Sequence, residues 1–168
     1  MTVTEALRIT QRAPRDAEPF EIGLACAFTP LHLQTFLQAH LQACLPAKRV
    51  IVRAGLYGAT VHTLESPTGD AKGVVVALEG VDLDPRLGFR EAGQWGPNAL
   101  PEILSNARQT LERLGDSIQR LSQKVRCAVS LPTLPLPPVF HAPGWQAGES
   151  ELLLEQLLAD FSSRLVRY

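Results

Sequence analysis

Short apolar runs alternate along the chain with longer segments in which apolar residues recur every three or four positions. The runs cover residues 20–28, 49–53, 72–79 and 125–130, and such lengths suit strands that are buried on both faces of a parallel sheet. The helical spacing covers residues 33–44, 59–64, 100–121 and 152–165. Strands that alternate with helices predict a three-layer α/β/α fold, in which helices cover both faces of a parallel sheet.

Segments without this periodicity precede and separate the predicted elements. Residues 1–19 are polar and are expected to form a leader, either a short helix or a loop, ahead of one domain over residues 20–168. Thr29 is expected to cap the first predicted helix, with the following proline at its first position. Residues 80–97 are predicted to form a long loop and residues 131–148 a Pro-rich loop. Because doubly wound domains usually continue with a further strand, we expect the chain to be the N-terminal part of a longer protein.

Composition excludes several classes of function. With 168 residues, of which 45% are hydrophobic, and a formal net charge of −1, the chain suits one globular domain with a substantial core. Its basic residues are scattered, so nucleic acid is not expected as a partner, and no apolar run approaches the ~20 residues of a membrane span. The widely spaced Cys26, Cys44 and Cys127 form neither a disulfide framework nor a zinc pattern. They are expected to be buried thiols of a cytoplasmic protein, and no metal or cofactor is predicted.

Four loops are expected to border a ligand site, because ligands of open parallel sheets bind outside the carboxyl ends of the strands. Each loop contributes candidate binding residues. They are Ala27 and Thr29 in the first loop, Tyr57 and Gly58 in the second, Gly80, Asp82 and Trp95 in the third, and His141 and Trp145 in the fourth.

The first loop resembles the nucleophile loop of SGNH (GDSL) hydrolases, where a strand enters a Gly-Asp-Ser-x-Thr pattern before a helix. Two positions before Thr29, where the resemblance places the serine, stands Ala27, whose methyl group cannot attack a carbonyl. Cys26 lies one position away and is a candidate nucleophile. The literal Gly-Asp-Ser at 115–117 falls within a predicted helix and is interpreted as part of it. The resemblance implies an SGNH-hydrolase-like or flavodoxin-like fold without the usual nucleophile.

The remaining SGNH positions depart from the family pattern as well. The family takes oxyanion donors from a glycine of the second loop, which Gly55 or Gly58 matches, and from an asparagine of the third loop, where Asp82 stands. A carboxylate at that place would repel a developing oxyanion. The family's late Asp-x-x-His pair has no match, because no aspartate stands three residues before His141.

Three stretches resemble, more specifically, the N-terminal SGNH-like domain of FkbH-like proteins: residues 22–37, 74–95 and 134–146. That family carries a second domain of the haloacid-dehalogenase (HAD) type and is implicated in loading a glyceryl unit from a bisphosphoglycerate onto an acyl carrier protein in polyketide pathways. The resemblance implies an accessory domain that contacts an acyl carrier protein, a HAD-type domain, or a small phosphorylated or acyl ligand. Asp82 and Asp84 match an Asp-x-Asp spacing, but the further phosphatase motifs are absent from this sequence.

Two alternatives stay open. One is an active esterase or acyltransferase with Cys26 as an atypical nucleophile. The other is a receiver-like or flavodoxin-like module, for which neither an acidic phosphoacceptor triad nor a flavin loop is evident.

Overall fold

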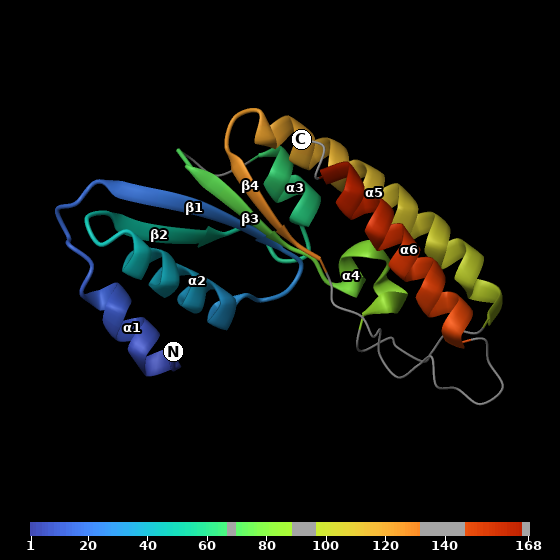
Figure 1. The fold of residues 1–168 in the computed structure, drawn as a ribbon, viewed down its shortest axis with the longest axis horizontal. Helices are drawn as coiled ribbons and strands as arrows, with labels where there is room; N and C mark the ends of the chain where they lie inside the picture. The colour runs from blue at the N-terminus through green and yellow to red at the C-terminus, as the bar shows by residue number, and fades with distance from the viewer. Residues whose placement is uncertain (67–69, 89–96, 132–146, 166–168) are drawn as a thin grey trace. The chain divides into compact units, whose positions relative to one another are not determined.

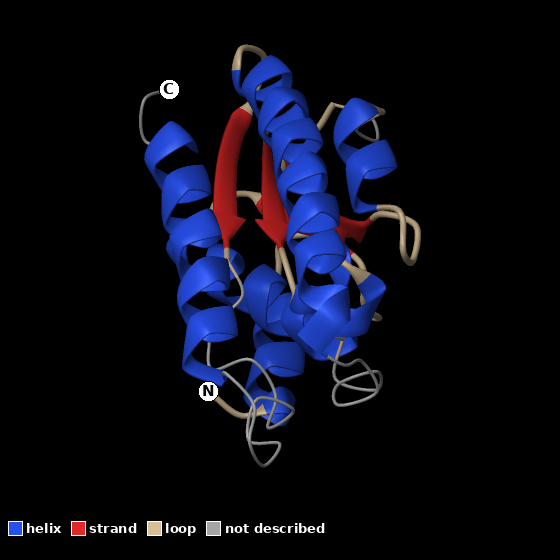
Figure 2. Cartoon of the chain, turned by 90° about the vertical axis from the view of Figure 1, so that its right-hand side faces the viewer, coloured by secondary structure: helices blue, strands red, loops and turns tan. Residues whose placement is uncertain are grey.

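A computed structural model describes residues 1–66, 70–88, 97–131 and 147–165, which are coloured in Figure 2. These residues fall into two compact units. The first unit comprises residues 1–76 and 124–129, and the second comprises residues 77–123 and 130–168.

The first unit is built around a four-stranded parallel sheet with the order β2-β1-β3-β4 (Figure 1). Its strands are β1 (Pro19–Cys26), β2 (Arg49–Ala54), β3 (Gly73–Ala77) and β4 (Arg126–Ser130), and its helices are α1 (Val3–Gln11), α2 (Leu31–Cys44) and α3 (Thr60–Glu65). All four strands coincide with the predicted apolar runs to within two residues at each end, and β1 and β3 each end two residues before their run does, so the α/β fold with a parallel sheet is confirmed. The strand order reverses between β1 and β3, which is where folds of this kind bind ligands.

Position in the sheet explains why β1 and β2 have different patterns. The last five residues of the inner strand β1, from Ile22 to Cys26, are all buried, so both of its faces are covered. The outer strand β2 alternates, with two buried valines between the exposed Arg49 and Arg53. Arg53 donates two hydrogen bonds of 3.0 Å to the carboxylate of Glu21 on β1, and they lower the pKa of Glu21.

Residues 1–19 contribute a helix to the first unit. α1 begins with a capping box, in which the backbone N–H of Thr2 donates to the Glu5 carboxylate and the N–H of Glu5 donates to the Thr2 hydroxyl. The helix packs against α2, and Ala6 is completely buried. Of the two options that the sequence left open for this segment, the helix is the one that forms.

A buried amide connects α2 to the start of β2. The side-chain Nε2 of Gln42 donates to the carbonyl oxygens of Leu45, at 3.2 Å, and Lys48, at 2.7 Å, and its Oε1 accepts from the N–H of Val50 at 2.9 Å. Gln42 is only 5% exposed. The side chain therefore satisfies three backbone groups that would otherwise lack partners in the α2–β2 connection.

The second unit is mainly helical. It contains α4 (Gly80–Leu83), the 3₁₀ turns η1 (Pro85–Leu87) and η2 (Pro97–Ala99), and the long helices α5 (Leu100–Ser122) and α6 (Ala147–Leu165). α5 and α6 lie side by side (Figures 1 and 2), and α5 buries a stripe of seven residues between Ile103 and Leu121. The prediction of one continuous loop over residues 80–97 is wrong in its first half, because the carboxylates of Asp82 and Asp84 bind backbone N–H groups and stabilise two short turns there.

Two local expectations are also wrong. α2 has Pro30 at its N-cap without a side-chain hydrogen bond, so Thr29 does not cap the helix; the first helical bond runs from the N–H of Gln34 to the Pro30 carbonyl. Cys44 is exposed rather than buried, because it lies about 200° around the helix from the buried Gln42. Among the described residues, no helix is both long and apolar enough to cross a membrane.

Candidate functional site

The loop after β1 presents no nucleophilic side chain at the expected position. Ala27 follows the strand directly and is partly exposed, with a methyl group where the resemblance places a serine. The neighbouring Cys26 is only 5% exposed, and its thiol donates to the carbonyl oxygen of Phe28 at 3.3 Å. A buried thiol that is hydrogen-bonded to the backbone is a packing residue by geometry, since a nucleophile must be reached by its substrate.

The second loop is tied to the first by its backbone. The N–H of Gly58 donates to the carbonyl oxygen of Ala27 at 3.3 Å, and the N–H of Gly55 donates to that of Leu24 at 2.9 Å. Both glycines that could match the family's oxyanion donor therefore have their amides engaged with the first strand or its loop. Gly58 has a φ of 69°, a left-handed conformation that glycine adopts without the steric cost of a side chain.

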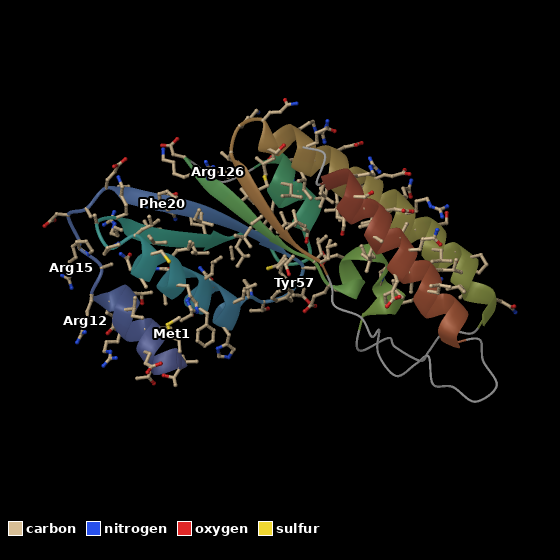
Figure 3. All side chains as sticks on the ribbon, viewed as in Figure 1. Met1, Arg12, Arg15, Phe20, Tyr57 and Arg126 are labelled. Atoms are coloured by element: carbon tan, nitrogen blue, oxygen red, sulfur yellow. The ribbon has the colours of Figure 1, made fainter. Side chains whose placement is uncertain are left out.

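Large apolar side chains stand exposed around these two loops. Tyr57 is 78% exposed, Leu56 68% and Leu31 69%. Figure 3 labels Tyr57 near the ends of the strands, and the residue lies in the turn that follows β2. Thr29 is exposed in the same region of the first unit. These two loops therefore have an alanine at the expected nucleophile position and a rim of exposed apolar side chains.

Two of the predicted third-loop residues, Gly80 and Asp82, belong to the second unit and have a structural role there. The carboxylate of Asp82 accepts from the N–H of Glu79 at 2.8 Å, and the N–H of Asp82 donates to the carbonyl of Glu79 at 3.0 Å. Gly80 lies against the backbone of Leu87, whose carbonyl oxygen would be 2.6 Å from a Cβ at position 80. Asp82 therefore orients α4, and Gly80 allows η1 to approach that helix closely.

The structure also reveals a buried ionic cluster that the sequence analysis missed. Asp84 is 1% exposed and receives hydrogen bonds from the backbone N–H and Nε of Arg86, both at 2.9 Å, from its Nη2 at 2.8 Å, and from the Asn106 amide at 3.0 Å. Arg86 also contacts Glu102 at 3.3 Å. Burial opposes ionisation of Asp84, but these donors outweigh it and lower its pKa, while the hydrogen bond to Asp84 raises the pKa of Arg86.

The cluster fastens η1 to α5 within the second unit and leaves the Asp84 carboxylate fully occupied. Its only sequence signal is the Asp-Pro-Arg triplet, since aspartate before proline favours a turn. Asn106 lies 22 residues further along, and nothing in the local sequence links it to Asp84. The carboxylates of Asp82 and Asp84, which share the Asp-x-Asp spacing, thus bind different partners. The described residues contain no group of three or more His, Cys, Asp or Glu side chains that could hold a metal ion.

Three candidate residues lie outside the described residues: Trp95, His141 and Trp145. Their proposed place at the binding edge stays a prediction. The Gly-Asp-Ser triplet at 115–117 lies inside α5, as expected, with Ser117 buried and its hydroxyl accepting from Arg120 at 3.2 Å. The triplet is a helix segment and not a nucleophile loop.

Comparison with known proteins supports the fold but identifies no activity. The sequence matches no protein-family profile and no curated protein. The structure is similar to the N-terminal part of the protein BF1531 from Bacteroides fragilis, whose crystal structure contains a phosphatase domain complexed with Mg. The TM-score is 0.62 at 12% sequence identity, over 99% of this chain and 42% of that chain. At this identity the likeness shows the fold alone, and the chain spans less than half of that structure.

The structural neighbour agrees in part with the expected relationship. It is the N-terminal part of a protein that contains a phosphatase domain, and the expected link to proteins with a HAD-type domain stays a prediction from the sequence. The assignment to the SGNH group, and the link to acyl carrier proteins, stay predictions from the sequence.

Proposed function

We propose that the chain is a non-hydrolytic, SGNH-like accessory domain that serves a phosphatase-type domain and assists the transfer of a glyceryl or acyl unit from a phosphorylated donor to an acyl carrier protein. The observation that carries the proposal is Ala27 at the end of β1, where a hydrolase of this kind needs an oxygen nucleophile. Without that oxygen no acyl-enzyme can form at this position.

Two further features support a binding role. The Gly58 amide, which would have to stabilise an oxyanion, donates instead to the Ala27 carbonyl. The exposed side chains of Tyr57 and Leu56 border the same loops, and exposed aromatic side chains are frequent anchors of protein interfaces. The similarity to part of a phosphatase-domain protein is consistent with a domain that accompanies such an enzyme.

A titration of the isotope-labelled chain with a holo acyl carrier protein, followed by NMR, tests the binding role. We expect the largest amide shifts at Thr29, Tyr57 and Gly58, and weaker binding for Tyr57→Ala. Leu152→Ala is the matched control, because Leu152 is 62% exposed on α6 in the second unit. Absence of any shift with the carrier protein in large excess would refute the carrier-protein role.

The claim that the domain is non-hydrolytic has a test of its own. A fluorophosphonate probe reacts with activated serine nucleophiles, so we expect no labelling of the native chain above that of the heat-denatured chain. Stoichiometric labelling of any serine, located by peptide mass mapping, would show that the missing oxygen at position 27 is supplied elsewhere and would overturn this part of the proposal.

A further inference from the structure

The charged residues of the chain are divided unevenly between the two units. The first unit holds nine Lys and Arg residues and six Asp and Glu residues, a formal net charge of +3, whereas the second holds seven and eleven, a net charge of −4. In the first unit the carboxylates of Glu18 and Glu21 are paired with Lys48 and Arg53. The excess of positive charge is therefore carried by other basic residues.

Four exposed arginines lie together at the amino ends of β1 and β2, and we call Arg8, Arg12, Arg15 and Arg49 the arginine surface. Arg8 and Arg12 are four positions apart on α1 and its C-cap, which places them on the same side of the helix. Nη1 of Arg49, the first residue of β2, donates to the carbonyl oxygen of Arg15 at 3.2 Å. Figure 3 labels Arg12 and Arg15 at the end of α1 and in the turn before β1. Basic residues that are scattered in the sequence are thus brought together by the fold.

Within the parts of the chain that the structure describes, no ion pair holds any member of the arginine surface. Guanidinium groups that lie near one another repel, and carboxylates placed between them remove this repulsion. The planar fork of an arginine binds a carboxylate through two parallel hydrogen bonds. On the same helix, Leu7 is 46% exposed and Val3 40%. The surface therefore offers arginines beside apolar side chains, a combination that is enriched in protein interfaces.

We propose that the arginine surface docks an acidic protein segment that carries several Asp or Glu side chains on one face. Other polyanions fit less well. Residues 1–19 contain no aromatic ring on which a nucleic-acid base could stack, and the carboxylates of Glu5 and Asp16, close to Arg8 and Arg15 in the sequence, would repel a continuous phosphate backbone. α1 packs against α2 with Ala6 completely buried, so that side of the helix is not available to a lipid surface.

The arginine surface is separate from the loops that carry the proposed carrier-protein role. β1 and β2 are parallel, and Pro19 pairs with Arg49 where both strands begin. Ala27 and Tyr57 follow the ends of the same two strands. The first unit therefore presents two different surfaces at opposite ends of its strands, and the docking of an acidic segment does not depend on the proposed function.

An NMR titration of the isotope-labelled full chain with a synthetic helical peptide tests the proposal. The peptide carries glutamates along one face and leucines beside them. The titration is run at about 20 mM and about 150 mM salt, because salt screens exposed charge pairs. We expect the largest amide shifts at Arg8, Arg12, Arg15 and Arg49, and tighter binding at the lower salt concentration.

Paired substitutions locate the binding energy. Arg8→Gln together with Arg12→Gln removes two charges while keeping residues that favour a helix, and we expect the affinity for the peptide to fall by about tenfold. Arg108→Gln together with Arg113→Gln is the matched control, because both are exposed arginines on α5 in the second unit. The control should bind the peptide like the wild type.

Three results would overturn the proposal. They are the absence of any shift with the peptide in large excess at the lower salt concentration, an equal loss of affinity in the control pair, and an unchanged affinity in the Arg8 and Arg12 pair. Tighter binding of a single-stranded oligothymidylate, or of vesicles of phosphatidylcholine and phosphatidylserine, would also overturn it and assign the surface to nucleic acid or to a membrane. The carrier-protein role is read separately, from shifts at Tyr57 and Gly58.

Discussion

Replacing Gly115 with alanine tests whether the Gly-Asp-Ser triplet is an ordinary part of α5. Gly58 is the one described residue with a positive φ, so the backbone at position 115 suits an L-amino acid. A Cβ there would lie 3.5 Å from Cε2 of Phe161 and 3.8 Å from Nη2 of Arg164, both ordinary van der Waals distances. Alanine is more favourable than glycine inside a helix by about 0.8–1.0 kcal/mol. We therefore expect Gly115→Ala to raise the free energy of unfolding by about 1 kcal/mol.

Urea denaturation followed by far-ultraviolet circular dichroism measures this change directly. We expect a higher midpoint at an unchanged m-value, and a Tm higher by about 2–4 °C for a chain of this size. Gly55→Ala is the control of opposite sign, because a Cβ at position 55 would lie 2.2 Å from Oγ1 of Thr63. If Gly115→Ala lowers the free energy of unfolding, although the neighbouring α6 atoms leave room for a Cβ, the triplet needs glycine for a reason other than helix formation, and its interpretation as an ordinary helix segment fails.

Three further predictions concern buried side chains. Iodoacetamide should alkylate the exposed Cys44 in the native protein while Cys26 reacts only on unfolding; peptide mass mapping that finds equal rates would contradict the burial of Cys26. Asp84→Asn should lower the free energy of unfolding by about 3 kcal/mol because it removes the buried charge that pairs with the partly exposed Arg86. The pKa of Asp84 is lowered on folding. The wild type should therefore exceed Asp84→Asn in free energy of unfolding by the full amount above the unfolded carboxyl pKa of about 3.9, and this difference should disappear as the pH falls through the folded pKa. Urea titrations at several pH values would contradict this if the difference between the two proteins stayed constant. Gln42→Leu should cost about 2–3 kcal/mol in the same assay, because it leaves buried backbone groups without partners, and a neutral result would show that water replaces the amide.

The candidate site could be predicted only where a local pattern marks it. The strand-turn-helix pattern around Ala27 located the first loop, and the turn at Gly58 located the second, because a short run of consecutive residues marks each of them. The hydrogen bond between them could not be foreseen, since it joins residues 31 positions apart in sequence. The Asp84–Asn106 contact was missed for the same reason, and the exposure of Cys44 depended on which side of α2 is covered.

The sequence by itself determined the four strands, the helices between them and the alanine that follows the first strand. These features depend on the spacing of apolar residues or on the identity of one residue, and both can be read from residues that are close together in the sequence. Only the tertiary structure decided the order of the strands, the packing of α1 on α2, the fate of residues 80–88 and the partners of Asp84. Each of these depends on which distant segments meet, and that choice is made by the burial of apolar surface across the whole chain rather than by any local pattern.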